Sequence, residues 1–481
     1  MNFARDVVEA APAHRLALIE LSREGRRREW SFGEVSAASA ALAGRLASLG
    51  VGRGDVVMTL IGNRPEWVLT MVACFRIGAV AMPCNEQLRA GDLRLRLAAA
   101  SPQAIVADVR NRSELAAARP ACPVLEIPDD SLWSGEPAPC VELNARDPGL
   151  ITFTSGTTGE PKGIVHGQRY LPGQTLQASV WLDARVGDLV WCTAASGWSK
   201  SARNVFIAPW IRGAAALLHD ARFDPAERLD ILARERVEIL CMAPTEYRVI
   251  AKRCTIGRVD SLRGLVAAGE ALNPEVLRAW EEACGLQIRD GYGQTETGQL
   301  TGVPAGSEIR PGSMGRPLPG VSLAVEDGEL VLADPQSDPT FFVGWLGGEA
   351  APEDQPWHTG DRVRADEDGY LYFEGRSDDV IISAGYRIGP FEVESALVSH
   401  AAVAEAAVVS APDEERGAVV RAVVVLRDGY SPSRALAGEL QAHVKAETAP
   451  YKYPRIVDFV EELPKTSSGK VQRAVLRDAS G

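Results

Sequence analysis

Hydrophobic residues in the first half of the chain alternate between two spacings. Stretches with apolar residues at every third or fourth position predict helices, and each is followed by a short apolar run that predicts a strand. Four such helix and strand pairs occupy 32–49 with 56–61, 66–77 with 79–82, 92–99 with 104–107, and 226–235 with 239–243. This alternation predicts an α/β fold, with parallel sheets covered by helices.

The pattern changes near residue 302. Short predicted strands, such as 321–325, 329–331 and 370–374, stand between many Gly and Pro residues and indicate a small barrel or antiparallel module. After Arg376 the sequence predicts a compact mixed α/β unit of about 100 residues, with a boundary in the run RSDDVI. The most apolar segment near the N-terminus, 67–83, predicts a buried helix that leads into a strand.

Composition is that of an ordinary globular protein. The chain has 481 residues, long enough for two or more domains, with 46% hydrophobic and 24% charged residues. Its formal charge of −13 argues against nonspecific binding of nucleic acids or anionic membranes, because both favour a basic surface. Any polyanion is therefore expected at a local positive site.

The cysteines and histidines do not follow a metal-binding pattern. None of the eight cysteines belongs to a C-x-x-C pair, which predicts reduced thiols and a cytoplasmic location, and the six histidines are dispersed. The N-terminal segment MNFARDVVEAAPAHRLALIEL contains acidic residues and lacks a long apolar run. It indicates neither a signal peptide nor a spanning helix.

The decapeptide TSGTTGEPKG at 154–163 has the composition of a phosphate-binding loop. Glycines expose backbone N–H groups, hydroxyls add donors, and Lys162 adds a positive charge. It is not a Walker A loop, because Lys162 stands between Pro161 and Gly163. The later SSGK fails that pattern too, because Pro464 occupies the position of the first glycine. Taken alone, the decapeptide is equally compatible with a surface turn.

Five further motifs follow along the chain. They are AAGEAL at 267–272, DGYGQTETG at 290–298, WHTGD at 357–361, GRSDDVIISAGYRIGPFEVE at 375–394 and PKTSSGKVQR at 464–473. In this order and spacing the six motifs resemble the adenylate-forming superfamily of acyl-CoA synthetases, luciferases and adenylation domains, over essentially the whole chain. The medium-chain acyl-CoA synthetase branch is the most similar, through GWSKSARNVFIAPWIRGA at 197–214 and SAGYRIGPFEVES at 383–395.

The resemblance implies a ligase that uses ATP, Mg²⁺ and CoA in two half-reactions. A carboxylic acid first displaces pyrophosphate from ATP and becomes an acyl-adenylate, because a thiol cannot expel oxide from a carboxylate. The thiol of CoA then displaces AMP. The expected partners are therefore small molecules, namely the acid, ATP and CoA, with no nucleic acid, no membrane and an unspecified oligomeric state.

The resemblance also implies a fold and a domain division. Residues 1–377 would form a large AMP-binding and acyl-binding domain of helix-covered β-sheets plus a small β-barrel module. Residues 378–481 would form a small mobile α+β C-terminal domain, with a hinge near Asp378.

ATP contacts are assigned to the motifs by the same resemblance. Lys162 and the hydroxyls of its loop would bind the β- and γ-phosphates, Tyr292 would stack on adenine, and Asp361 would accept hydrogen bonds from the ribose hydroxyls. The expected ATP-binding residues are Thr154, Ser155, Gly156, Thr157, Thr158, Gly159, Lys162, Gly269, Glu270, Ala271, Asp290, Gly291, Tyr292, Gly293, Gln294, Thr295, Asp361, Arg376 and Arg387.

The catalytic residues implied by the resemblance are Lys470, Thr295 and Glu296. Lys470 would bridge the carboxylate and the phosphate during adenylation, Thr295 would donate to the α-phosphate, and Glu296 would hold Mg²⁺. Gly385 would line the pantetheine tunnel for CoA after the C-terminal domain rotates.

The expected acyl pocket is lined by Trp198, Ser199, Ala268 and Gly293. Acetyl-CoA synthetases resemble this chain around DGYGQTE but carry Trp where Gly293 stands, so the pocket is expected to admit medium-chain, branched or aryl acids. Lys200 and Arg203 are expected to face solvent. The alternative is that either reaches the pocket and favours an acid with a second polar or anionic group.

Other functions remain open at this level. The acyl-adenylate could be passed to a carrier-protein thiol instead of CoA, and a luciferase-type oxygenase is a more remote alternative. A nucleotide-binding protein without ligase activity is a third possibility, against which the joint presence of Lys470, Glu296, Thr295 and Asp361 argues.

Overall fold

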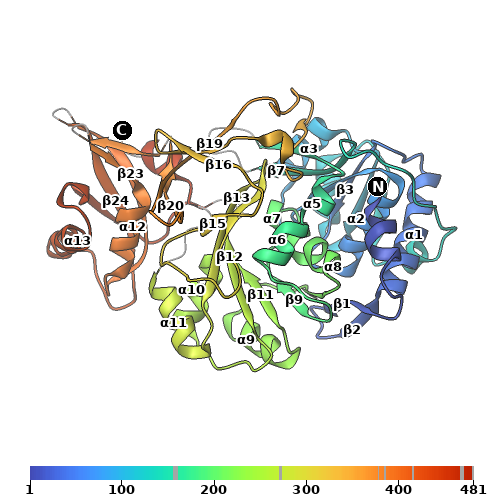
Figure 1. The fold of residues 1–481 in the computed structure, drawn as a ribbon, viewed down its shortest axis with the longest axis horizontal. Helices are drawn as coiled ribbons and strands as arrows, with labels where there is room; N and C mark the ends of the chain where they lie inside the picture. The colour runs from blue at the N-terminus through green and yellow to red at the C-terminus, as the bar shows by residue number, and fades with distance from the viewer. Residues whose placement is uncertain are drawn as a thin grey trace.

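A computed structural model of the protein describes residues 1–154, 161–269, 274–377, 379–383, 386–413, 416–465 and 471–478. Two large sheets with their helices form the N-terminal part, a four-stranded sheet follows, and a smaller C-terminal unit lies at one end of the molecule (Figure 1). Within the described ranges, no helix is both long and apolar enough to cross a membrane.

The first large sheet has nine strands, and its central pairs are parallel. In spatial order they are β15 (Arg316–Pro317), β14 (Gly298–Gly302), β13 (Ile288–Gln294), β12 (Gly264–Ala268), β11 (Ile239–Met242), β9 (Leu189–Cys192), β10 (Ala215–His219), β1 (Leu16–Leu21) and β2 (Arg27–Ser31). Antiparallel strands close both edges.

The second large sheet has seven strands. In spatial order they are β18 (Gly344–Trp345), β8 (Lys162–Gly167), β7 (Pro148–Thr154), β4 (Val80–Cys84), β3 (Val56–Leu60), β5 (Ala104–Asp108) and β6 (Val124–Ile127). The pairs from β7 to β6 are parallel, whereas β7 and β8 form an antiparallel pair.

Helices separate the two large sheets and cover their outer faces. The main core joins α1 (Phe32–Ser48) and α2 (Pro65–Ile77) to inward-facing residues of both sheets. The outer face of the nine-stranded sheet packs against α9 (Pro225–Arg234), α10 (Pro244–Arg253) and α11 (Pro274–Cys284). The outer face of the seven-stranded sheet packs against α3 (Ala90–Ala100) and α4 (Arg112–Ala118). The large domain is thus built of five alternating layers.

The sequence of α2 explains its place between the sheets. Pro65 starts the helix, where its missing N–H costs nothing, and Gly78 ends it with a φ of 74° that favours glycine. Every residue of α2 except Glu66 is buried. The prediction of a buried helix leading into a strand is confirmed, because β4 begins at Val80.

Short helices complete the large domain. They are η1 (Ala4–Glu9), η2 (Val109–Asn111), η3 (Asp130–Trp133), α5 (Tyr170–Gly173), α6 (Thr175–Val180), α7 (Ser199–Ala202), η4 (Arg203–Ile207), α8 (Ala208–Ile211) and η5 (Pro335–Ser337). The four predicted helix and strand pairs are confirmed as α1 with β3, α2 with β4, α3 with β5, and α9 with β11.

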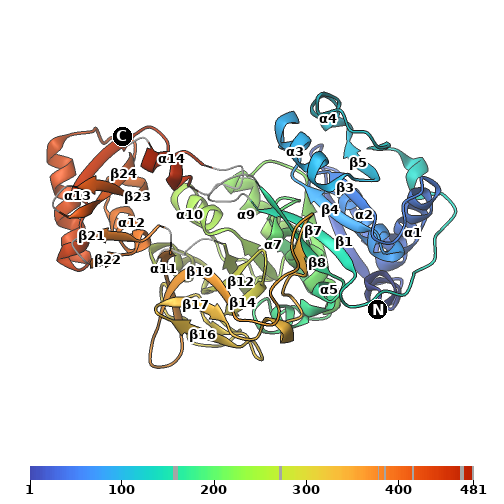
Figure 2. The ribbon, with the colours of Figure 1, turned by 90° about the horizontal axis from the view of Figure 1, so that it is seen from above.

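The predicted β-rich module is an antiparallel sheet of four strands. Its order is β16 (Leu323–Glu326), β17 (Glu329–Leu332), β19 (Trp357–Ala365) and β20 (Leu371–Arg376). Seen from above in Figure 2, β16 and β17 lie at the lower edge of the molecule, next to β19.

The C-terminal unit is a small α+β domain. It contains β21 (Ile381–Ser383), β22 (Tyr386–Ile388), α12 (Pro390–Ser399), β23 (Val403–Asp413), β24 (Gly417–Leu426), α13 (Arg434–Glu447), η6 (Pro450–Lys452), β25 (Ile456–Val460) and α14 (Arg473–Asp478). One face of the β23-β24-β25 sheet packs on α12 and α13. A hydrogen bond of 3.4 Å from Lys252 Nζ to the Ala404 carbonyl connects this unit to α10.

The aromatic cluster at the centre of the main core gives a stability prediction. Phe206 makes edge contacts with Trp67 and Trp210, at ring-centroid distances of 5.9 and 5.0 Å. We expect Phe206→Ala to lower the free energy of unfolding by about 3–5 kcal/mol, because it leaves a cavity where repacking is restricted. Val186 is 68% exposed, so Val186→Ala should change stability by less than about 0.5 kcal/mol. Equal midpoints of chemical denaturation for both variants would contradict this assignment.

Candidate active site

The phosphate-loop motif joins β7 to β8. Thr154 and Lys162 face each other in this antiparallel pair, and Thr154 Oγ1 donates to the Lys162 carbonyl at 3.5 Å. Lys162 is exposed, so its backbone is held in the sheet while its ammonium group is accessible to a ligand. Five residues predicted to bind phosphate, Ser155, Gly156, Thr157, Thr158 and Gly159, lie outside the described residues.

The predicted adenine-binding residues follow two parallel strands. Ala268 in β12 pairs with Gly291 in β13, so the carboxyl ends of these strands meet at one edge of the nine-stranded sheet. Ligands of open α/β sheets bind at such edges. Gly269 follows directly and has a φ of 100°, a conformation that favours glycine. Glu270 and Ala271 lie outside the described residues.

Asp361 is the centre of a hydrogen-bond network between two sheets. Its carboxylate accepts hydrogen bonds from the Tyr292 hydroxyl, from Gln294 Nε2 at 2.8 Å and from Arg376 Nη1 at 3.1 Å. Gln294 also accepts a hydrogen bond from Trp357 Nε1 at 3.2 Å. Burial raises the pKa of Asp361, and the Arg376 guanidinium opposes that rise. The network therefore brings together the predicted adenine and ribose residues and adds Trp357, the first residue of the WHTGD motif, for which the sequence predicted no role.

Glu296 lies close to this network. Burial raises the pKa of its carboxyl, while the positive charges of Arg376 and Lys162 lower that pKa and the Asp361 charge raises it. The predicted metal ligand is thus close enough to interact with residues from both nucleotide motifs. Its neighbour Thr295 is half-buried, and the backbone of Thr295 contacts the ring of His166 from β8.

Asp290 occupies a buried position beneath the strand ends. Its Oδ1 accepts a hydrogen bond of 2.8 Å from the Gly291 N–H, and its carbonyl accepts one of 3.2 Å from Trp181 Nε1. Burial raises the pKa of Asp290 to about 8, although the nearby Lys200 charge lowers it. These contacts support the backbone of β13 from below.

The predicted acyl-binding residues lie at the start of α7 and at the end of β12. Gly197, with a φ of 87°, precedes Trp198, and a Cβ atom at this glycine would lie 2.4 Å from the Asn85 nitrogen. Lys200 Nζ donates to the Ala268 carbonyl at 2.9 Å. Two of the predicted pocket segments, 198–199 and 268, are therefore brought together by Lys200.

The expectation that Lys200 and Arg203 face solvent is wrong. Lys200 bonds to β12, and Arg203 is only 4% exposed. Arg203 begins η4, in which every residue is buried by the main core, so no solvent-facing side is available to it, whereas Lys200 in α7 is half-buried. The alternative that either side chain reaches the pocket region describes the structure better.

Gly293 lies where β13 pairs with β14 through a register shift. A Cβ atom at Gly293 would lie 1.8 Å from the Gly298 carbonyl oxygen. A side chain there would displace β14, so a Gly293→Trp variant would report on this clash as well as on the acyl chain. The contribution of Gly293 to pocket size stays a prediction.

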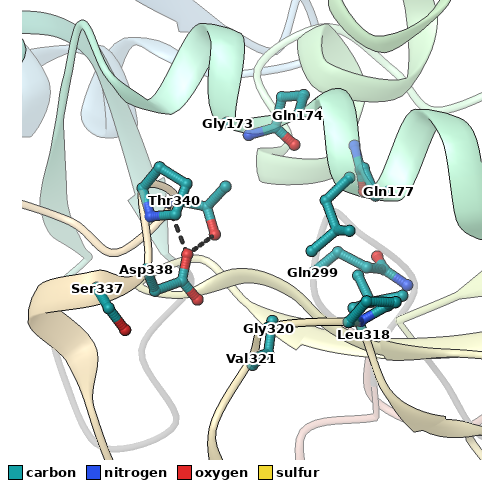
Figure 3. A pocket seen from close by; sticks show the side chains of 13 residues that line it. Gly173, Gln174, Gln177, Gln299, Leu318, Gly320, Val321, Ser337, Asp338 and Thr340 are labelled. Carbon is teal, nitrogen blue, oxygen red and sulfur yellow. Dashed lines mark hydrogen bonds between the residues drawn. The ribbon is translucent and has the colours of Figure 1, made fainter.

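A separate cavity of about 220 Å³ opens beside α5 and α6. Gln177 and Gln299 lie on one side of it, and Asp338 with Thr340 on the other, where Thr340 Oγ1 donates to Asp338 Oδ1 at 2.7 Å (Figure 3). None of the residues predicted for ATP, the acyl group or CoA lines this cavity.

The remaining predicted residues are in the C-terminal part. Asp378, Gly385 and Lys470 lie outside the described residues. The backbone of Arg387 belongs to β22, which pairs with β21. In the described part of the chain, no group of three or more metal-binding side chains occurs.

Two family models match the chain. The model described as AMP-binding enzyme matches residues 4–336, and the model described as AMP-binding enzyme C-terminal domain matches residues 392–470. The two matches fall on the large domain and on the C-terminal unit described above.

Similar proteins cover nearly the whole chain. Human mitochondrial acyl-coenzyme A synthetase ACSM4 is 41% identical, over 99% of this chain and 90% of that protein. The uncharacterized acyl–CoA ligase YtcI of Bacillus subtilis strain 168 is 38% identical, over 97% and 94%. The crystal structure of the anthranilate CoA ligase AuaEII with anthranoyl-AMP matches with a TM-score of 0.89 at 29% identity, over 100% and 97%. The chain therefore belongs to the AMP-binding enzyme family, within its acyl-CoA synthetases.

Proposed function

We propose that this acyl-CoA synthetase converts a carboxylic acid larger than acetate to its acyl-adenylate, with release of pyrophosphate, and then transfers the acyl group to CoA with release of AMP. The observation that carries the proposal is the network around Asp361. It joins Tyr292 and Gln294 of β13 to Arg376 of β20, next to Glu296. Residues that could bind a nucleoside and residues that could bind its phosphates are thus close together around Asp361.

In this proposal Asp361 binds the ribose. An ionised carboxylate only accepts hydrogen bonds, and both ribose hydroxyls can donate to it. Tyr292, Gln294 and Arg376 hold the carboxylate oriented before the nucleotide arrives, which reduces the ordering cost of binding. Adenine would lie between Tyr292 and the backbone near Gly269.

The phosphates would lie between Lys162 and Thr295. An anionic acid must approach the α-phosphate of an anionic nucleotide, so positive charge has to offset their repulsion. Lys162 is accessible for this role, and Glu296 is the residue that would hold Mg²⁺, an ion commonly bound by one or two carboxylates plus substrate phosphates. When bound, that ion supplies further positive charge.

The C-terminal domain would complete each half-reaction in turn. We propose that Lys470 and Arg387 contact the reacting groups during adenylation, that the backbone at Asp378 then rotates, and that Gly385 lines the path of pantetheine. The same proposal divides the chain into a large domain of residues 1–377 and a mobile C-terminal domain of residues 378–481. The folded α+β unit supports it, since this unit has its own core and connects to α10 through Lys252.

The acid proposed here is medium-chain, branched or aryl. The small residue Ala268 supports a pocket larger than acetate requires, the contribution of Gly293 stays part of the proposal, and each buried CH₂ contributes about 0.8 kcal/mol to binding. We place the enzyme in the cytoplasm, as a reducing compartment suits its eight free cysteines. Fatty acid metabolism is the corresponding role.

A pyrophosphate-release assay tests the proposal as a whole. A panel of medium-chain, branched and aryl acids should support release of pyrophosphate, and acyl-CoA should form only when CoA is added. Transfer to a holo-carrier protein but not to CoA would instead identify a carrier-protein ligase. Absence of pyrophosphate release with every acid would contradict ligase activity.

The first prediction concerns the ribose contact. Asp361→Asn keeps the size of the side chain but removes its charge, and hydrogen bonds to charged groups contribute about 1.5–3 kcal/mol. We expect the KM for ATP to rise about 10- to 100-fold. Asp368, in the turn between β19 and β20 and with a side chain 61% exposed, supplies the control Asp368→Asn. Unchanged KM values in both variants would exclude Asp361 from the nucleotide site.

A second prediction separates the half-reactions. Lys470→Ala should reduce acyl-adenylate formation by at least about 100-fold, because it removes a charge expected at the transferring phosphate. Thioester formation from supplied acyl-adenylate should stay near the wild-type rate. Lys465→Ala, which breaks an exposed ion pair with Glu405, is the matched control. Equal loss of both half-reactions in Lys470→Ala would disprove the assigned role.

The third prediction follows from the raised pKa of Glu296. Its carboxyl must be ionised to hold a cation, so adenylation should fall as the pH decreases through its pKa. Because burial raises that pKa, this loss should occur above the ordinary value of 4.5. Raising the Mg²⁺ concentration about tenfold should shift the acid limb of the pH–rate profile to lower pH, since the metal ion and the proton compete for the Glu296 carboxylate. If the acid limb does not shift with Mg²⁺, the group that titrates there is not Glu296.

A further inference from the structure

Arg203 is a buried cation in the acyl-binding region. It is 4% exposed, and its Nε and Nη1 atoms are buried without a hydrogen-bond partner among the residues that the structure describes. Arg203 also lacks a carboxylate partner within that part of the chain. A guanidinium stays protonated in proteins, and an unpaired buried charge is costly. This position therefore favours an anionic ligand.

The position of Arg203 relates it to the reacting groups. Arg203 follows Ser199, a predicted acyl-pocket residue, by four positions along the helical segment of α7 and η4, so both lie on similar sides of it. Its side chain is also hydrogen-bonded to Tyr170, and its charge acts on His166, whose ring centroid lies 4.0 Å from that of Tyr170. His166 in turn contacts the backbone of Thr295. Arg203 is thus linked to Thr295 through His166 and lies four residues after a predicted acyl-pocket residue.

Other unpaired polar atoms belong to residues close to Arg203 in the chain, or hydrogen-bonded to such a residue. Asn204 Nδ2, Gln177 Oε1 and Ser199 Oγ are all buried and have no partner within the described ranges. Asn204 and Gln177 are linked by a hydrogen bond of 3.0 Å from Gln177 Nε2 to Asn204 Oδ1. The unpaired atoms of Arg203 and Asn204 are donors, as expected beside an anionic oxygen, whereas the unpaired atom of Gln177 is an acceptor and Gln177 lines the separate cavity described above.

Two neighbouring cations are less suited to bind a further anion. Lys200 Nζ donates to the Ala268 carbonyl at 2.9 Å. Arg169 forms an ion pair with Glu353 at 2.7 Å and donates to the Phe341 carbonyl at 3.1 Å. Arg203 is therefore the cation whose position and unmatched donors point to a ligand.

We infer that the acid activated by this synthetase carries a second carboxylate, at the end remote from the reacting one, and that Arg203 binds this second group. The inference rests on the proposed function and narrows its substrate class from medium-chain acids in general to dicarboxylic acids. The reaction is unchanged: only one carboxylate is adenylated, and the other provides binding energy.

Matched acids test this inference with the wild-type enzyme. For chains of four to eight carbons, each dicarboxylate is compared with its monocarboxylate and with its monomethyl ester, which keeps the acceptor oxygens but removes the charge. Charged hydrogen bonds contribute about 1.5–3 kcal/mol, so the preferred dicarboxylate should exceed both analogues by about 10- to 100-fold in kcat/KM. A preference for the monocarboxylate at every length would overturn the inference while leaving the ligase function established.

Variants identify the residue responsible. Arg203→Met should lower kcat/KM for the dicarboxylate by about 10- to 100-fold and should change kcat/KM for the monocarboxylate by less than about threefold. Arg76→Met is the matched control, because Arg76 is equally buried but pairs with Glu9 beside α2. A parallel loss for both kinds of acid would contradict the role of Arg203. If Arg203→Met does not fold, the comparison of acids with the wild-type enzyme still tests whether dicarboxylates are preferred. If the wild-type enzyme is inactive with every acid, the ligase proposal itself is refuted.

Discussion

The hydrogen bonds to Asp361 connect two sheets that are far apart in sequence. Tyr292 and Gln294 reach it from the nine-stranded sheet, while Arg376 reaches it from within the four-stranded sheet. Because Glu296 follows Gln294 in the chain, the same contacts also fix the place of the predicted metal ligand. The nucleotide site therefore depends on how these sheets pack, and loss of the Asp361 charge would affect both architecture and binding.

Charge is the second constraint. The chain carries a net charge of −13, yet its reaction must bring two anions together. The structure concentrates positive groups locally, with Lys162 and Arg376 near Glu296, and Lys200 and Arg203 in the helical segment that carries predicted acyl-pocket residues. Of these groups Arg203 is the most deeply buried, and a buried charge in a medium of low polarity is costly unless a partner is bound. Substrate binding and charge compensation are thus coupled.

Much of this architecture follows from the sequence. Residues 66–82 predict α2 and β4 because an apolar helix ended by Gly78 has few alternatives, and the ordered motifs predict the nucleotide site. The sequence does not predict the fate of Lys200 and Arg203. Their polarity favours solvent, but Arg203 lies in η4, which the main core buries, and Lys200 is half-buried and donates a hydrogen bond to the Ala268 carbonyl. The contribution of Trp357 and the clash at Gly293 likewise depend on strand pairing, which local patterns do not specify.

The central claim is that the acid attacks the α-phosphate and leaves one oxygen on AMP. Labelling both carboxylate oxygens of the acid with ¹⁸O tests this most directly, with AMP and acyl-CoA analysed by mass spectrometry after a single turnover. We expect one ¹⁸O atom in AMP and one in the thioester, because CoA attacks the acyl carbon and the bond from this carbon to the bridging oxygen breaks. Unlabelled AMP, or ADP as the nucleotide product, would contradict an acyl-adenylate intermediate.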